Sequence, residues 1–68
     1  MKSISGKKLC KVVEKSGWIL VRVKGSHYIY TKEDVSKIIV IPVHGNRDLP
    51  TGTLRGILKD AELTEDDI

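Results

Sequence analysis

The first apolar positions of the chain follow a helical period. Three of them recur at helical spacing on one face: Leu9, Val12 and Val13. Lysines occupy the remaining positions, so the predicted helix is basic outside and apolar inside. Ser5 lies where an N-cap is expected, and Gly17 is the expected stop signal. The pattern predicts a helix over residues 6–16.

From Trp18 onward the period changes to two, which is typical of a strand with one buried face. Residues 19–24 form the first such run and residues 27–31 the second. The two runs are separated only by Gly25 and Ser26, and a two-residue loop with glycine first suits a type II′ hairpin turn. Such a turn fixes the register. The predicted opposed pairs are Lys24 with His27, Val23 with Tyr28, Arg22 with Ile29, and Val21 with Tyr30.

Directly opposed residues share one face of a sheet. This register therefore predicts an apolar, core-facing set: Ile19, Val21, Val23, Tyr28 and Tyr30. Arg22, Lys24 and His27 are expected together on the opposite, open face. The prediction depends on the turn being two residues long.

A polar turn is expected over residues 32–37, followed by a third strand over residues 38–43. Apolar residues occupy both faces of this strand, so the pattern does not indicate which face is buried. Pro42 removes a hydrogen-bond donor and favours an edge position.

Pro50 is expected at the first position of a second helix. Its predicted buried stripe consists of Leu54, Ile57, Leu58 and Ala61. Gly52 and Gly56 each weaken a helix by about 1 kcal/mol relative to alanine, which suggests close packing or a backbone contact there. Thr64 and Asp67 have the spacing of a capping box.

The predicted order is α-β-β-β-α, with a three-stranded antiparallel sheet and both helices on one face. This is an α+β two-layer sandwich, and we expect a single domain over residues 1–68. A chain of 68 residues buries only about 60% of the surface of its unfolded form, which leaves little room for an enclosed ligand chamber.

The longest apolar stretch covers residues 38–43 and is too short to span a bilayer. The first eight residues lead into no apolar region of the kind that secretory signals contain. The single cysteine, Cys10, excludes an intrachain disulfide framework. Together these features predict a cytoplasmic protein.

The net charge of +3 is unevenly distributed. Through Lys59 the chain has twelve basic and four acidic side chains, a net charge of +8, and five acidic residues follow in the last nine positions. A small body of this charge is attracted to phosphate backbones or to an acidic partner. The alternative explanation is that the charged surface serves only to keep the domain soluble.

His27 is the best candidate for chemistry, because it follows the tight turn with Arg22 and Lys24 as predicted neighbours. Histidine readily exchanges protons near neutral pH, and adjacent cations can hold a phosphodiester. RNA supplies its own nucleophile, the 2′-hydroxyl, so this set could cleave RNA slowly without a metal. An exposed strand histidine without a role is the alternative.

Other chemistry has weaker support in the sequence. His44 ends the third strand beside Gly45 and is expected to cap loop backbone groups. The isolated positions of Cys10, His27 and His44 give no zinc-binding spacing, and no glycine-rich phosphate loop is present. We therefore expect neither a metal nor a cofactor.

Several short motifs of the sequence resemble, in their order and spacing, those of the HicA family of bacterial toxins. They are Ser5-Gly6-Lys7-Lys8-Leu9, Gly17-Trp18, Arg22-Val23-Lys24-Gly25-Ser26-His27-Tyr28, Ile41-Pro42-Val43-His44 and Gly52-Thr53-Leu54-Arg55-Gly56-Ile57-Leu58-Lys59. The resemblance implies a messenger-RNA interferase with a double-stranded-RNA-binding-like fold. It also implies that His27 is the catalytic residue. The chain has Glu62 where the family usually has a glycine after the second helix.

The resemblance further implies a HicB antitoxin that binds the toxin and masks the histidine, with any oligomer forming through that partner. On this hypothesis Arg22 and Lys24 hold phosphate, and Gly25 and Ser26 let the RNA backbone approach. Two basic residues of the first helix, Lys7 and Lys8, complete the expected RNA-binding set. A non-catalytic RNA-binding module and a protein-interaction module that has lost its activity are the alternatives.

Overall fold

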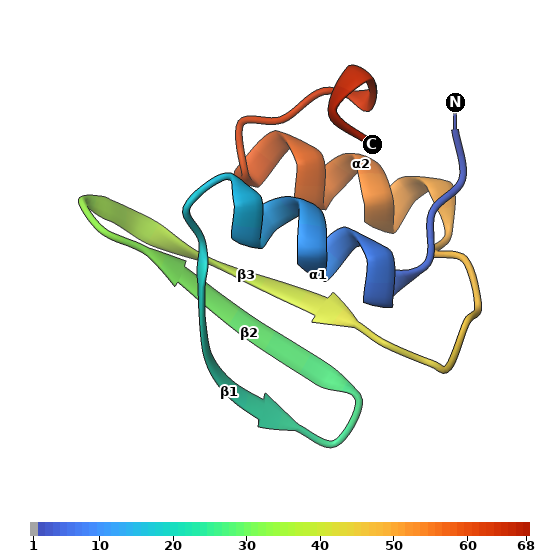
Figure 1. Cartoon of the computed structure of the whole chain (residues 1–68), viewed down its shortest axis with the longest axis horizontal. Helices are drawn as coiled ribbons and strands as arrows, with labels where there is room; N and C mark the ends of the chain where they lie inside the picture. Colours follow the sequence, from blue (N-terminus) through green and yellow to red (C-terminus); the bar gives the residue numbers. More distant parts are fainter. Residues whose placement is uncertain (1) are drawn as a thin grey trace.

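The computed structural model describes residues 2–68, with two helices packed on one face of a three-stranded antiparallel sheet (Figure 1). Its elements are α1 (Gly6–Lys15), β1 (Ile19–Lys24), β2 (His27–Lys32), β3 (Val35–Pro42), α2 (Thr51–Asp60) and the short 3₁₀ helix η1 (Glu65–Asp67). The strand order is β1-β2-β3, so β2 is central. The predicted α-β-β-β-α order and α+β class are confirmed.

The ends of α1 follow the sequence signals closely. The Ser5 hydroxyl accepts a hydrogen bond from the backbone N–H of Lys8 at 3.2 Å, which confirms Ser5 as the N-cap. The helix ends at Lys15, one residue before the predicted end. Gly17 then adopts a φ of +99°, and the N–H of Trp18 bonds to the carbonyl of Val13 at 3.0 Å.

The start of α1 packs directly on the end of β3. A Cβ atom on Gly6 would overlap the carbonyl oxygen of Pro42, so only glycine fits there without movement of the backbone. The segment before the helix is also held, because the N–H of Leu49 donates to the carbonyl of Ile4 at 2.9 Å. The N-terminal turn of α1 is therefore fixed against the strand end that borders β2.

The hairpin of β1 and β2 has the predicted register near its turn. Lys24 pairs with His27, Val23 with Tyr28 and Arg22 with Ile29. The fourth predicted pair is wrong, because a bulge lies between Leu20 and Arg22 and Leu20, not Val21, stands opposite Tyr30. An extra residue in one strand shifts the pairing beyond it without disturbing the pairs at the turn.

The predicted apolar face is only partly buried. Tyr30 is fully buried and Tyr28 is half-buried against the core, but Ile19, Val21 and Val23 are exposed by 61%, 52% and 48%. The helices pack on β3, and β1 lies at the far edge of the sheet beyond their cover (Figure 1). The core therefore forms between the helices and the strands β2 and β3.

The third strand is longer than predicted. It begins at Val35 and ends at Pro42, because the chain turns in two residues, Glu33 and Asp34, and not over residues 32–37. Asp34 has a φ of +65°, a conformation that aspartate tolerates better than most residues. Ile39 and Ile41 supply the buried face, and Pro42 lies on an edge strand as predicted.

The second helix begins at Thr51, so Pro50 is its N-cap and not its first residue. The predicted stripe of Leu54, Ile57, Leu58 and Ala61 is buried. The expectation that Gly52 and Gly56 pack closely is wrong. Both are exposed, and a Cβ atom on either would meet nothing within 4 Å.

The chain leaves α2 through a residue in the left-handed conformation. Glu62 has a φ of +59°, while the N–H of Leu63 bonds to the carbonyl of Leu58 at 2.8 Å. Helix ends of this kind favour glycine, so Glu62 adopts this conformation at some cost in strain. The capping box of η1 is present, since the N–H of Thr64 donates to Asp67 at 2.8 Å.

A partly buried hydrogen bond joins the helix layer to the sheet. The Tyr30 hydroxyl donates to the Glu14 carboxylate at 2.5 Å. Burial, followed by hydrogen bonding to Cys10 and Glu14, raises the pKa of Tyr30 far above its ordinary value. The folded protein therefore holds this phenol in its neutral form.

We expect Gly6→Ala and Gly56→Ala to shift stability in opposite directions. The first forces a methyl group onto the carbonyl of Pro42 and should lower the free energy of unfolding by about 1–3 kcal/mol. The second adds a helix-favouring methyl group in open space and should raise it by about 1 kcal/mol. Urea denaturation of both variants tests this pair, and equal effects would contradict the packing described for α1.

Stability should also fall at alkaline pH because of Tyr30. Its folded pKa is raised, so its contribution is complete below the unfolded pKa of about 10 and is lost as the pH rises above that value, by up to about 1.4 kcal/mol per pH unit. Denaturation at pH 9, 10 and 11 measures this slope. Tyr30→Phe should flatten it, and the matched control Tyr28→Phe should leave it unchanged. A wild-type slope in Tyr30→Phe would refute the assignment.

Candidate functional site

His27 lies at the corner of the sheet next to the hairpin turn. It is the first residue of β2, with Lys24 opposite it on β1 and Pro42 opposite it on β3. Side chains alternate along a strand, and Tyr28 and Tyr30 face the helices. His27 therefore faces the other way, on the side of the sheet that no helix covers, and it is exposed.

The turn beside His27 is tight and accessible. Gly25 has a φ of +60°, and a Cβ atom there would meet nothing within 4 Å. The carbonyl of Ser26 accepts a hydrogen bond from the N–H of Val43 at 2.7 Å, which ties the turn to the chain just after β3. The backbone at Gly25 is thus open to a ligand, while Ser26 anchors the corner.

Two cations share the face of His27. Lys24 is its cross-strand partner, and Arg22 lies two residues earlier on β1 with the same parity. Within residues 2–68, opposite charges approach within 4.0 Å only at Lys37 and Asp60, 3.9 Å apart on another part of the surface. No carboxylate of the described chain therefore neutralises the corner by direct pairing.

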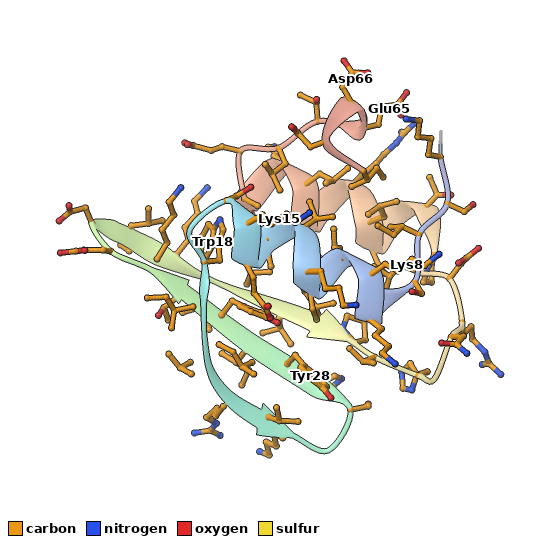
Figure 2. The ribbon with its side chains drawn as sticks, in the orientation of Figure 1. Lys8, Lys15, Trp18, Tyr28, Glu65 and Asp66 are labelled. Carbon is orange, nitrogen blue, oxygen red and sulfur yellow. The ribbon has the colours of Figure 1, made fainter. Side chains whose placement is uncertain are left out.

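The acidic C-terminal segment lies far from this corner. Figure 2 shows Glu65 and Asp66 on η1, beyond α2, at the opposite end of the molecule from Tyr28 and the hairpin turn. The Lys2 ammonium donates to the carbonyl of Ile68 at 3.2 Å, so the two ends of the described chain meet there. The acidic residues leave the positive potential of the corner largely intact.

The sequence-predicted site residues fall into two groups. Arg22, Lys24, Gly25, Ser26 and His27 come together at the corner. Lys7 and Lys8 do not join them on that face, because both lie on α1 in the helix layer.

The two lysines of α1 also differ from one another. Lys7 borders a hollow that Tyr28 also lines, so it lies just behind the corner. Lys8 borders a different hollow beside Asp48, and Figure 2 shows it near the start of α1.

His44 lies in the exposed loop after β3. Its carbonyl accepts a hydrogen bond from the N–H of Arg47 at 3.1 Å, which closes a turn of the loop. Within residues 2–68 its ring makes no hydrogen bond, so the loop is held by the backbone of His44. A structural role for the ring stays a prediction.

Sequence reasoning missed a hollow behind the corner. It has a volume of about 410 Å³ and is lined by Lys7, Cys10, Tyr28, Val43, Gly45 and Asn46. The parity of Tyr28 predicts that it faces the core, and it does pack against the core, to which the buried Cys10 belongs. Burial is the main reason that the pKa of Cys10 is raised. The sequence gives no direct signal for this hollow, because its lining comes from α1, from β2 and from the chain after β3.

The uncovered side of the sheet is apolar next to its cations. Ile38 and Val40 on β3 are exposed by 56% and 40%, and Val40 pairs with the half-buried Ile29. We call this side the open face, defined by Arg22, Lys24, His27, Ile29, Ile38 and Val40. Exposed apolar area of this kind, bordered by charges, is typical of an interaction surface.

Two further properties of residues 2–68 bear on function. No three histidine, cysteine, aspartate or glutamate side chains lie close enough together to form a metal site. None of the helices is long and apolar enough to cross a membrane.

Comparison with known proteins identifies the family. The family model described as the HicA toxin of bacterial toxin–antitoxin systems matches residues 6–63. A search of curated proteins found no match. Since the matched segment covers most of the 68 residues, the chain belongs to the HicA toxin family.

Proposed function

We propose that this HicA family toxin is an endoribonuclease that cleaves messenger RNA in the cytoplasm with His27 as its catalytic group. The observation that carries the proposal is the corner of the open face, where an exposed histidine stands between the end of β3 and Lys24 on β1. Arg22 adds a second cation to the same face. This is a set of groups suited to a phosphodiester, and RNA contributes the nucleophile itself.

The reaction needs one proton transfer for each bond that changes. The 2′-oxygen of the RNA attacks the adjacent phosphorus and loses its proton, while the bond from phosphorus to the 5′-oxygen breaks and that oxygen gains a proton. His27 either accepts the first proton or donates the second, and solvent water exchanges the other. The products are a 2′,3′-cyclic phosphate and a 5′-hydroxyl, and no cofactor is required for the balance.

The neighbouring residues hold the phosphate in this mechanism. Lys24 and Arg22 stabilise the charge that develops on the phosphoryl oxygens. The exposed backbone at Gly25 lets the RNA approach closely, and Ser26 beside it holds the turn in place. Lys7 and Lys8 lie on α1, on the helix side of the sheet and not on the open face, so we assign them to phosphates other than the one at the cleaved bond.

The replacement His27→Gln should lower the cleavage rate by about 10²- to 10⁴-fold, because glutamine keeps the polarity of the side chain but transfers no proton at neutral pH. The rate is measured on a labelled RNA of mixed sequence. His44→Gln is the matched control and should retain the wild-type rate. Full activity in His27→Gln, or equal cleavage of an all-deoxy strand, would refute the mechanism.

The toxin–antitoxin family implies an antitoxin partner. We propose that this partner is a HicB-type protein that binds the open face and thereby covers His27. The exposed apolar side chains of Ile38 and Val40 adjoin the cations of that face, so one surface offers both apolar area and charge for a complementary partner.

Placing a charge on the open face should therefore weaken antitoxin binding. We expect Val40→Asp to reduce affinity for a purified HicB-type antitoxin that binds the wild-type chain by about tenfold or more. Val35→Asp changes the same residue type on the same strand but with the opposite parity, and it should retain binding. Isothermal titration of the purified proteins measures both, and equal effects would contradict the assignment of the interface.

A non-catalytic RNA-binding module is the second candidate, favoured by the basic outer side of α1. Against it, the start of α2 (Thr51, Gly52 and Thr53) lacks the lysines on which duplex-RNA-binding domains usually rely. A gel shift with RNA that stays intact would support this candidate over the first.

A further inference from the structure

The hollow behind the corner has the composition of a nucleobase pocket. Its lining combines an aromatic ring from Tyr28, an amide from Asn46 and an ammonium group from Lys7. Proteins recognise unpaired bases by stacking them on aromatic rings and by hydrogen bonding to their edges, with cations for the backbone. Its volume of about 410 Å³ falls within the range of small-ligand sites.

Three polar side chains of this hollow have no hydrogen-bond or ion-pair partner among residues 2–68. Within residues 2–68, neither the hydroxyl of Tyr28 nor the side-chain amide of Asn46 makes a hydrogen bond, and the Lys7 ammonium has no carboxylate within 4.0 Å. Asn46 and Lys7 are exposed, and Tyr28 is half-buried. Gly45 adopts a φ of +59° and has open space where a Cβ atom would lie, so the loop presents its backbone to the hollow.

Two other hollows of the described chain have a different character. The one beside the β2–β3 turn mixes lysines with acidic side chains, among them Lys59 and Glu62, and its one aromatic residue, Trp18, is almost fully buried. The one beside His44 has no aromatic residue in its lining. An accessible ring together with an amide is found behind the corner.

The hollow also lies next to the proposed catalytic group. Tyr28 directly follows His27 on β2, so the two side chains emerge from neighbouring residues on opposite faces of the same strand end. The hydrogen bond from Val43 to Ser26 joins the wall of the hollow to the turn. An RNA strand that passes over the end of the sheet at Gly25 can reach both.

We propose that this hollow is a base-binding subsite for an unpaired nucleotide of the substrate that flanks the bond to be cleaved. The Tyr28 ring stacks on the base, the Asn46 amide reads its edge, and Lys7 contacts the adjoining phosphate. The identity of the ligand as RNA rests on the proposed endoribonuclease function. The subsite makes Asn46 a specificity-determining residue and Tyr28 a positioning residue.

The test is a titration of the ¹⁵N-labelled protein with AMP, CMP, GMP and UMP, followed by NMR. The largest shifts should fall on the amides of Lys7, Cys10, Tyr28, Gly45 and Asn46, with at least one of the four bases preferred. Tyr28→Leu should weaken binding of that nucleotide by about 5- to 150-fold, the range for loss of one stacked base.

Because Tyr28 also contacts the core, two surface variants keep the test independent of folding. Asn46→Ala should alter the order of preference among the four nucleotides. Lys7→Ala should weaken binding by about two- to fivefold, while the matched control Lys11→Ala, on the same helix, should not. Shifts confined to the open face, or variants that bind every nucleotide as the wild type does, would overturn the subsite.

The base-binding subsite and the catalytic role of His27 can be refuted independently of each other. Nucleotide binding in the hollow together with full cleavage by His27→Gln would refute the catalytic assignment and retain the subsite. Cleavage that depends on His27 but keeps the same base preference in Asn46→Ala would retain the catalytic role of His27 and refute the base-binding subsite.

Discussion

The two-residue turn at Gly25 and Ser26 determines where every group of the proposed site lies. A type of turn that accepts a positive φ at its first residue closes the hairpin without an extra residue, so Lys24 and His27 become direct cross-strand partners. Because side chains alternate along each strand, this pairing puts His27 on the same face as Arg22 and Lys24. Tyr28, the next residue, then lies on the opposite face. A turn longer by one residue would exchange the two faces.

The position of the corner depends in turn on contacts made across the chain. Gly6 allows the first turn of α1 to sit on the carbonyl of Pro42, and the bond from Val43 to Ser26 holds the hairpin turn against the same strand end. Catalytic groups need support of this kind, because a displacement of about 1 Å can lower a rate by about 10²-fold. Two helices of ten residues each cover β2 and β3 but leave β1 and the whole open face uncovered. The fold thus exposes both the proposed catalytic histidine and an apolar surface that a partner can cover.

The parts of this structure that follow local rules could be predicted from the sequence. Ser5 and Gly17 mark the ends of α1, and the glycine-serine turn gives the register at His27. The bulge at Val21 could not be predicted, since Ile19, Leu20 and Val21 are all apolar and this run does not show where an extra residue enters the strand. The exposure of β1 depends on how far the helices reach, which is a tertiary property. The hollow behind the corner could not be predicted for the same reason, because it forms where a helix, a strand and a loop meet and none of its residues stands out alone.

The central claim is that the RNA supplies the nucleophile and the protein supplies His27 and its cations. The most direct measurement is the chemical identity of the new ends when the purified chain cleaves a defined RNA oligonucleotide, determined by mass spectrometry. The account predicts a 2′,3′-cyclic phosphate, or the monophosphate formed from it, on one fragment and a 5′-hydroxyl on the other. A 5′-phosphate paired with a free 3′-hydroxyl would mean that another nucleophile attacks, and would contradict the account.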